Sequence, residues 1–83
     1  MKETYAISKK VNGEQMIGIP QIIIDKSVLI SNDSPNNNLF VRRISKGIVL
    51  NEIKIKSGHI IKLNLENVDS LMMRGNVEYR IWE

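Results

Sequence analysis

The chain has 83 residues, with 12 Lys and Arg, 9 Asp and Glu, one His and no Cys. This length fits a single domain with a small hydrophobic core, and the lack of cysteine excludes disulfides and Cys-based zinc sites. The net charge of +3 is mild, and basic and acidic residues alternate along the chain. The composition therefore lacks the dense basic stripe that is typical of nucleic-acid-binding proteins.

The residue pattern favours strands over helices. The chain contains 14 Ile and 6 Val, and no long window keeps apolar residues at helical spacing. Its longest stretch without a charged residue, Gln15–Ile24, has ten residues and is too short to span a bilayer. Met1-Lys2-Glu3 leads into mixed polar sequence without an apolar signal region. We expect a soluble all-β protein with no membrane partner.

An N-terminal β-hairpin or arm is predicted over residues 1–25. Thr4–Val11 and Gln15–Ile19 alternate in polarity and flank Asn12-Gly13. This dipeptide is a strong hairpin signal, because both residues tolerate the positive φ of a type I′ turn. Pro20 then interrupts the pattern, since proline cannot donate to a strand ladder.

Residues 26–83 are predicted to form the core of the fold. Strands are expected at Ser27–Ser31, Leu39–Ile44, Ile48–Leu50, Glu52–Lys56, His59–Leu65, Leu71–Arg74 and Val77–Ile81. Turns are expected at Ser45-Lys46-Gly47, Ser57-Gly58 and Gly75-Asn76, and a single helical turn capped by Asp69 is an alternative for Asp69–Arg74. The sequence thus predicts one domain, residues 1–83, folded as a small antiparallel β-sandwich or flattened barrel of about seven to nine short strands.

No pattern of catalytic or metal-binding residues emerges. His59, the one histidine, follows Gly58 at a strand start, where a surface residue is expected. Nothing in the spacing of Glu66 or Asp69 arranges a metal site around it, and neither a G-x-S-x-G motif nor a phosphate-binding glycine loop occurs. We expect a protein that is not an enzyme and uses no cofactor, metal ion or small-molecule substrate.

Six basic residues would form a positive patch if their strands were neighbours: Lys9, Lys10, Arg42, Lys54, Lys56 and Lys62. Lys54 and Lys56 share a strand face, and Lys62 would join them across the Ser57-Gly58 turn. Such a patch would contact phosphates. The interleaved glutamates favour instead an ordinary solvated sheet face, with edge lysines that discourage aggregation.

Three apolar residues are predicted to point away from the core: Phe40, Ile60 and Trp82. Each lies on the strand face opposite to an inward set, namely Leu39/Val41, Ile61/Leu63/Leu65 and Val77/Tyr79/Ile81. A two-layer protein of this size cannot bury both faces of several strands by itself. We therefore expect Phe40, Ile60 and Trp82 to contribute to a protein interface.

The order of turns and strands in residues 27–83 resembles a known class. An Asn-rich turn ends at Asn38 before Leu39-Phe40-Val41, and Gly47-Ile48-Val49-Leu50 and Ser57-Gly58-His59-Ile60-Ile61 follow. This pattern, closed by Val77–Trp82, resembles the small all-β virion proteins of tailed bacteriophages, of the head-decoration or fibre-base type. The chain departs from it in having Leu71-Met72-Met73 where an aromatic residue is usual and Arg42-Arg43 after a strand.

The resemblance implies a structural role. Such a protein would bind a capsid or tail lattice, associate with copies of itself, and be located in the virion and, during assembly, in the host cytoplasm. Two alternatives remain open at this point. One is a small nucleic-acid-binding regulator that uses the basic sheet face, and the other is a phage-encoded inhibitor of a host protein.

Overall fold

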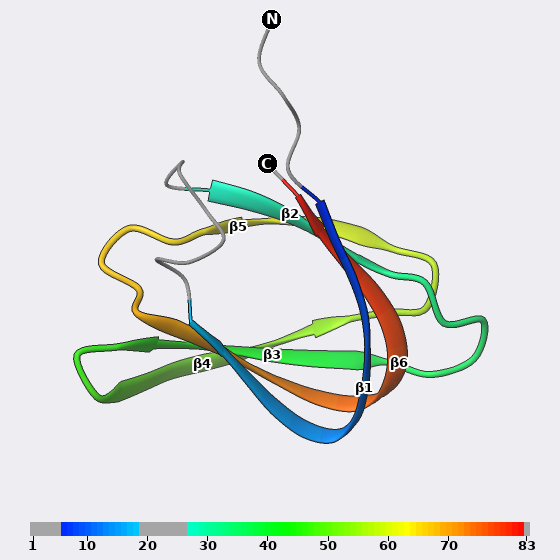
Figure 1. Cartoon of the computed structure of the whole chain (residues 1–83), viewed down its shortest axis with the longest axis horizontal. Helices are drawn as coiled ribbons and strands as arrows, with labels where there is room; N and C mark the ends of the chain where they lie inside the picture. Colours follow the sequence, from blue (N-terminus) through cyan, green and yellow to red (C-terminus); the bar gives the residue numbers. More distant parts are fainter. Residues whose placement is uncertain (1–5, 19–26, 83) are drawn as a thin grey trace, which may run out of the picture.

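The structure is a computed structural model that describes residues 6–18, with side chains from residue 9 onward, and residues 27–82 (Figure 1). All regular structure in these residues is β-strand, which confirms the all-β prediction. The strands are β1 (Ala6–Gly18), β2 (Ser27–Asn32), β3 (Leu39–Ser45), β4 (Ile48–Ile55), β5 (Ile60–Asn64) and β6 (Ser70–Trp82).

The last strand, β6, organises the antiparallel sheet, whose order is β4-β3-β6-β2-β5. Along one edge of β6, β3 pairs with its first part, between Ser70 and Arg74, and β2 pairs with its last part, between Tyr79 and Trp82. Along the other edge, β1 pairs with the whole of β6, from Gly18↔Ser70 to Ala6↔Trp82. The sheet curls as β1 and β6 bend together (Figure 1), so the fold is a half-barrel, in keeping with the predicted flattened barrel.

The core fills the inside of this curl. The alternate β6 residues Leu71, Met73, Val77, Tyr79 and Ile81 are each at most 2% exposed, as strand periodicity requires for one buried face. They pack with buried apolar residues of the other strands and of the β5–β6 connection: Val11, Ile17, Val28, Ile30, Leu39, Val41, Ile55, Leu63, Leu65 and Val68. The inward faces predicted from the alternation of β3, β5 and β6 are therefore largely correct, with Ile61 only partly buried.

The hairpin turn predicted at Asn12-Gly13 does not form, so this prediction is wrong. Asn12-Gly13 lies inside β1, which runs as one strand from Ala6 to Gly18 and pairs with β6 throughout. Gly13 has the positive φ that the turn prediction required, 96°, but uses it for a bend. Likewise Gly75, with φ 144°, bends β6 instead of ending a strand. Residues 1–5 and 19–25 of the predicted arm, with Pro20 among them, lie outside the described residues.

The turn between β3 and β4 forms as predicted. Ser45 pairs with Ile48, and the two residues between them, Lys46 and Gly47, have φ values of 51° and 80°, as a type I′ hairpin turn requires. The carboxylate of Asp69 accepts a hydrogen bond from the backbone N–H of Lys46 at 2.6 Å. Asp69 thus stabilises this turn, and the alternative helical turn at Asp69–Arg74 does not form because Ser70 begins β6.

A buried asparagine holds the β2–β3 loop in place. Asn32, 1% exposed, donates through Nδ2 to the carbonyl oxygens of Asn37 at 2.7 Å and Ile55 at 2.9 Å. Its Oδ1 accepts from the backbone N–H of Ser34 at 2.9 Å. These three bonds satisfy the buried amide. The bond to Ile55 also ties the loop to the end of β4, a segment that is distant from Asn32 in the sequence.

Candidate interaction surface

The outside of the curl presents the candidate site. Register partners share a face of a sheet, so the pairings of β4, β3, β6 and β1 define three rows of outward side chains. These rows are Lys54/Phe40/Arg74/Glu14, Glu52/Arg42/Met72/Met16 and Val49/Ile44/Ser70/Gly18. We refer to these residues together as the first outer face.

Charged groups of the first outer face pair with one another. Glu52 accepts from Nε of Arg42 at 2.9 Å and from a terminal nitrogen of Arg74 at 3.1 Å. The hydrogen bond from Arg74 holds the pKa of Glu52 below its ordinary value. The guanidinium of Arg74 also lies 4.3 Å from the centre of the Phe40 ring, in a cation–π contact. Arg42 and Arg74 are therefore held in fixed positions around a carboxylate and a ring.

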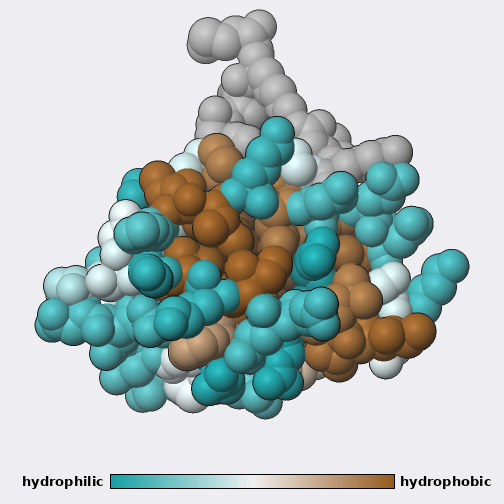
Figure 2. Space-filling model, turned by 180° about the vertical axis from the view of Figure 1, so that it is seen from behind, coloured by the Kyte–Doolittle hydropathy of each residue, from teal (hydrophilic) through white to brown (hydrophobic). Residues whose placement is uncertain are grey.

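Apolar side chains lie among these charges. Met16 is 60% exposed and Val49 is 51% exposed, and Phe40, Ile44 and Met72 are half-buried. At the nearby β3–β4 turn, Ile48 and Leu50 are also exposed. Figure 2, which views the molecule from behind, shows brown apolar surface that extends from the upper left through the middle to the lower right of the view, with hydrophilic residues around it. The exposed apolar surface is thus gathered and not scattered.

The pairings of β5, β2 and β6 define a second outer face, with the rows Lys62/Leu29/Trp82 and Ile60/Ser31/Arg80. Arg80 donates to the carboxylate of Asp33 through Nε at 2.8 Å and through a terminal nitrogen at 3.2 Å. It also lies 5.5 Å from the Trp82 ring. The hydrogen bond from Arg80 lowers the pKa of Asp33, and Ser31 adds a further bond to the same carboxylate at 2.9 Å.

The structure separates the three residues predicted to form an interface. Ile60, 56% exposed, and the half-buried Trp82 both lie on the second outer face. Phe40 lies on the first outer face, under Arg74. Sequence reasoning missed the exposed group formed by Met16 and Ile48–Leu50. The run of three apolar residues directly after a two-residue turn was a usable signal for the latter, because such a run exposes side chains on both faces of a hairpin end.

The six basic residues do not form one patch among the described residues. Lys54 and Arg42 share the first outer face, but Arg42 is paired with Glu52. Lys62 lies on β5, at the opposite end of the strand order from β4, so the predicted contact across the Ser57-Gly58 turn does not arise from strand pairing. Lys9 and Lys10 lie on β1, and Lys56 follows the end of β4. The basic groups are thus distributed around the sheet.

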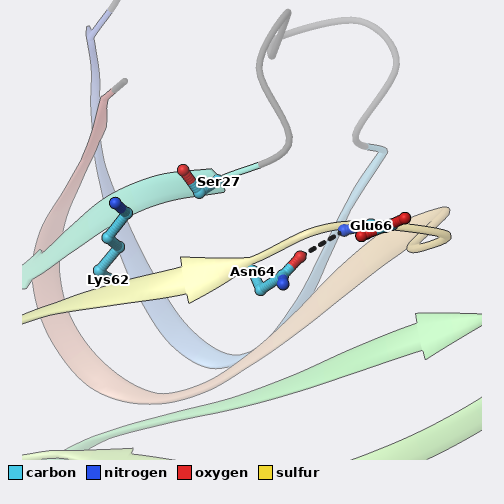
Figure 3. Close-up of a pocket in the computed structure, with 4 residues that line it drawn as sticks. All are labelled: Ser27, Lys62, Asn64 and Glu66. Carbon is cyan, nitrogen blue, oxygen red and sulfur yellow. Dashed lines mark hydrogen bonds between the residues drawn. The ribbon is translucent and has the colours of Figure 1, made fainter.

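Two clefts occur between described residues. One, of about 440 Å³, is lined by Ser27, Lys62, Asn64 and Glu66 (Figure 3). In it Asn64 accepts a hydrogen bond from the backbone N–H of Glu66 at 2.8 Å. The other, of about 270 Å³, lies along the β2–β3 loop and includes Lys10, Asp33 and Glu78. Neither lining pairs a nucleophile with a histidine base, because His59 lines neither cleft.

In the part of the chain that the structure describes, no group of three or more His, Asp or Glu side chains is arranged to hold a metal ion. Residues 6–18 and 27–82 contain no helix with the length and apolar character needed to cross a membrane. No protein-family model, curated protein or solved structure matches this chain.

Proposed function

We propose that this chain is a non-enzymatic structural subunit that acts by binding other proteins, including copies of itself, and that it belongs to a tailed-phage virion. One observation carries the protein-binding role: the described residues bury a continuous apolar core and still expose Met16, Ile48, Val49, Leu50 and Ile60, each by at least 36%. The placement in a virion rests on the resemblance of residues 27–83 to small virion proteins.

The energetics of burial support this role. Covering a large apolar side chain stabilises a complex by about 1.5–3 kcal/mol. Phe, Met, Trp and Arg are among the residue types enriched in protein interfaces. The first outer face combines Phe, Met and Arg, and the second combines Trp with Arg. Arg74 over Phe40 and Arg80 beside Trp82 also bind carboxylates, which partly orders these side chains before a partner binds.

The mass of the protein in solution tests this proposal. Light scattering should give a mass above that of the single chain, and a DNA duplex added at low salt should leave this mass unchanged. Lys54→Glu combined with Lys56→Glu should also leave it unchanged. A monomer that binds DNA, and loses this affinity in the Lys54/Lys56 variant, would show that the chain is a nucleic-acid-binding regulator instead.

Trp82→Ala tests the second outer face. Its ring lies on the outward side of β6, so its loss should weaken association more than it lowers the thermal midpoint of the monomer. Val28→Ala, on the buried face of the neighbouring strand β2, is the control for lost core packing and should lower the thermal midpoint without a selective effect on association. A strongly destabilised monomer with unchanged association would show that Trp82 acts in the fold alone.

A further inference from the structure

The first half of β4 is an unprotected sheet edge. β4 ends the strand order, and within residues 6–18 and 27–82 it pairs with β3 alone. Its first residues, Ile48, Val49 and Leu50, are 64%, 51% and 36% exposed. Natural proteins discourage pairing at open edges with lysine. The edges of β1 and β5 carry Lys9, Lys10 and Lys62, whereas no charged residue occurs from Gly47 to Asn51.

The β3–β4 turn decides which backbone groups this edge presents. Ser45 and Ile48 close a two-residue turn, so their backbone groups face each other. Because the direction of backbone groups alternates along a strand, the N–H and C=O of Val49 point away from β3. A register shift between Arg42 and Ile44 places an extra β4 residue opposite β3 after Val49. The regular part of the open edge is therefore Ile48 and Val49, and Leu50 begins the bulge.

We infer that a second copy of this chain pairs with this edge, antiparallel and about a two-fold axis at Val49. The inference rests on the proposed function, because it names the first partner of the subunit. Val49 then faces Val49 of the second copy, and Ile48 faces Leu50. Such pairing is isologous, so one short segment serves both sides of the contact.

Charge complementarity favours a second copy over an unrelated strand. Lys46 precedes Val49 by as many residues as Glu52 follows it. Antiparallel pairing centred on Val49 therefore brings the turn that carries Lys46 in each copy toward the part of β4 that carries Glu52 in the other, where Lys46 would join the two arginines that already bind Glu52. Ile48 and Val49 lie on opposite faces of the hairpin end, so the same pairing covers the apolar side chains that are exposed on both faces.

A cysteine placed on the proposed axis gives a direct test, because the chain has no cysteine of its own. Directly paired residues in antiparallel strands lie about 5.5 Å apart at Cα, within reach of a disulfide. Under mild oxidation, Val49→Cys should form a covalent dimer at least tenfold faster than two controls. Asn51→Cys lies on the same strand but off the axis, and Asn36→Cys lies in the exposed β2–β3 loop, outside both outer faces. Equal rates for Val49→Cys and Asn51→Cys would overturn the proposed register.

Val49→Lys tests the edge itself, since it installs the protecting residue that the other edges carry. Light scattering should show the wild type as a dimer or a larger assembly built from it, and the Val49→Lys variant with at least tenfold weaker self-association. Its thermal midpoint at monomer concentrations should be unchanged, because Val49 is half exposed. Asn36→Lys, which adds the same charge in the exposed β2–β3 loop outside both outer faces, is the matched control and should associate like the wild type.

The outcomes separate the two proposals. A wild type that associates while Val49→Lys leaves its mass unchanged overturns the edge pairing and leaves the proposed function standing. A wild type that stays monomeric up to millimolar concentration also overturns the edge pairing. In that case self-association is also excluded from the proposed function, and the DNA measurement decides between a subunit that binds only other proteins and a nucleic-acid-binding regulator.

Discussion

Gly13 and Gly75 face each other across the β1–β6 pair, and both have a positive φ, 96° and 144°. The two strands bend at this shared position. On one side of the bend β6 pairs with β3, and on the other side it pairs with β2. The bend therefore joins the two outer faces, and its geometry decides how they are oriented relative to each other.

Gly75→Ala should destabilise the protein by about 1–3 kcal/mol, because a Cβ at this φ is strained. A Cβ at this position would also lie 2.9 Å from the backbone oxygen of Asn38, which cannot move as a side chain can. Gly18→Ala is the matched control, since its Cβ would meet nothing within 4 Å. Urea unfolding of both variants measures the difference, and equal stabilities would show that β6 bends without help from Gly75.

Asn32→Ala should lower the free energy of unfolding by about 3 kcal/mol, because it leaves buried backbone groups without partners. The groups affected are the carbonyls of Asn37 and Ile55 and the N–H of Ser34. Asn36→Ala, in the exposed part of the same loop, should cost less than about 0.5 kcal/mol. Thermal melts of the two variants check this, and a loss confined to Asn36→Ala would contradict the role given to Asn32.

Tyr79 should make the protein lose stability in alkali. Its hydroxyl donates to Oε1 of Gln15 at 3.0 Å, and burial raises the pKa of Tyr79 to about 12. The unfolded pKa is about 10, so this contribution is fully present below pH 10 and is lost as the pH rises toward 12. Tyr79→Phe should cost about 1 kcal/mol at pH 7 and flatten the alkaline decline.

Urea unfolding at pH 8, 10 and 11 compares the wild type with Tyr79→Phe. Gln15→Ala is a useful companion, because it removes the acceptor and keeps the phenol. An alkaline decline that is identical in the wild type and Tyr79→Phe would mean that another group is responsible for it.

Asp33 should contribute fully to stability above about pH 4 and lose this contribution gradually as the pH falls further, through its lowered pKa. Its folded pKa lies below the ordinary value because Arg80 donates to it, so the contribution is lost as the pH falls below about 4. Asp33→Asn should therefore reduce the drop in thermal midpoint between pH 6 and pH 3. Glu52→Gln tests the other lowered carboxyl in the same way. A full acid-induced drop in both variants would contradict this account.

Local sequence was sufficient for the parts of the fold that depend on alternation and on two-residue turns. All four inward positions are at most 2% exposed: Leu39, Val41, Tyr79 and Ile81. The turn at Lys46-Gly47 also forms where glycine and a short loop predict it. These features need only strand periodicity and permitted φ values, both of which neighbouring residues determine.

The remaining features depend on partners that are distant in sequence. Asn12-Gly13 and Gly75-Asn76 carry the residues of a turn, yet each bends a continuous strand because the two segments pair with each other. Which strands neighbour one another is also non-local. The short turn between them predicts Lys62 beside Lys54, whereas β4 and β5 lie at opposite ends of the strand order. The same limit explains why Met16 and Val49 were not recognised as parts of one face.

The pairing of β1 with β6 also has a kinetic consequence. The first and last described strands are partners, and β2 and β3 both need β6 as a neighbour. During synthesis, β1, β2 and β3 therefore lack β6 as a pairing partner until β6 has left the ribosome. Proteins dominated by such distant contacts fold in milliseconds to seconds. In that interval the apolar face of β1 and the Ile48–Leu50 segment are both uncovered, so the subunit is most open to premature association just before its own sheet closes.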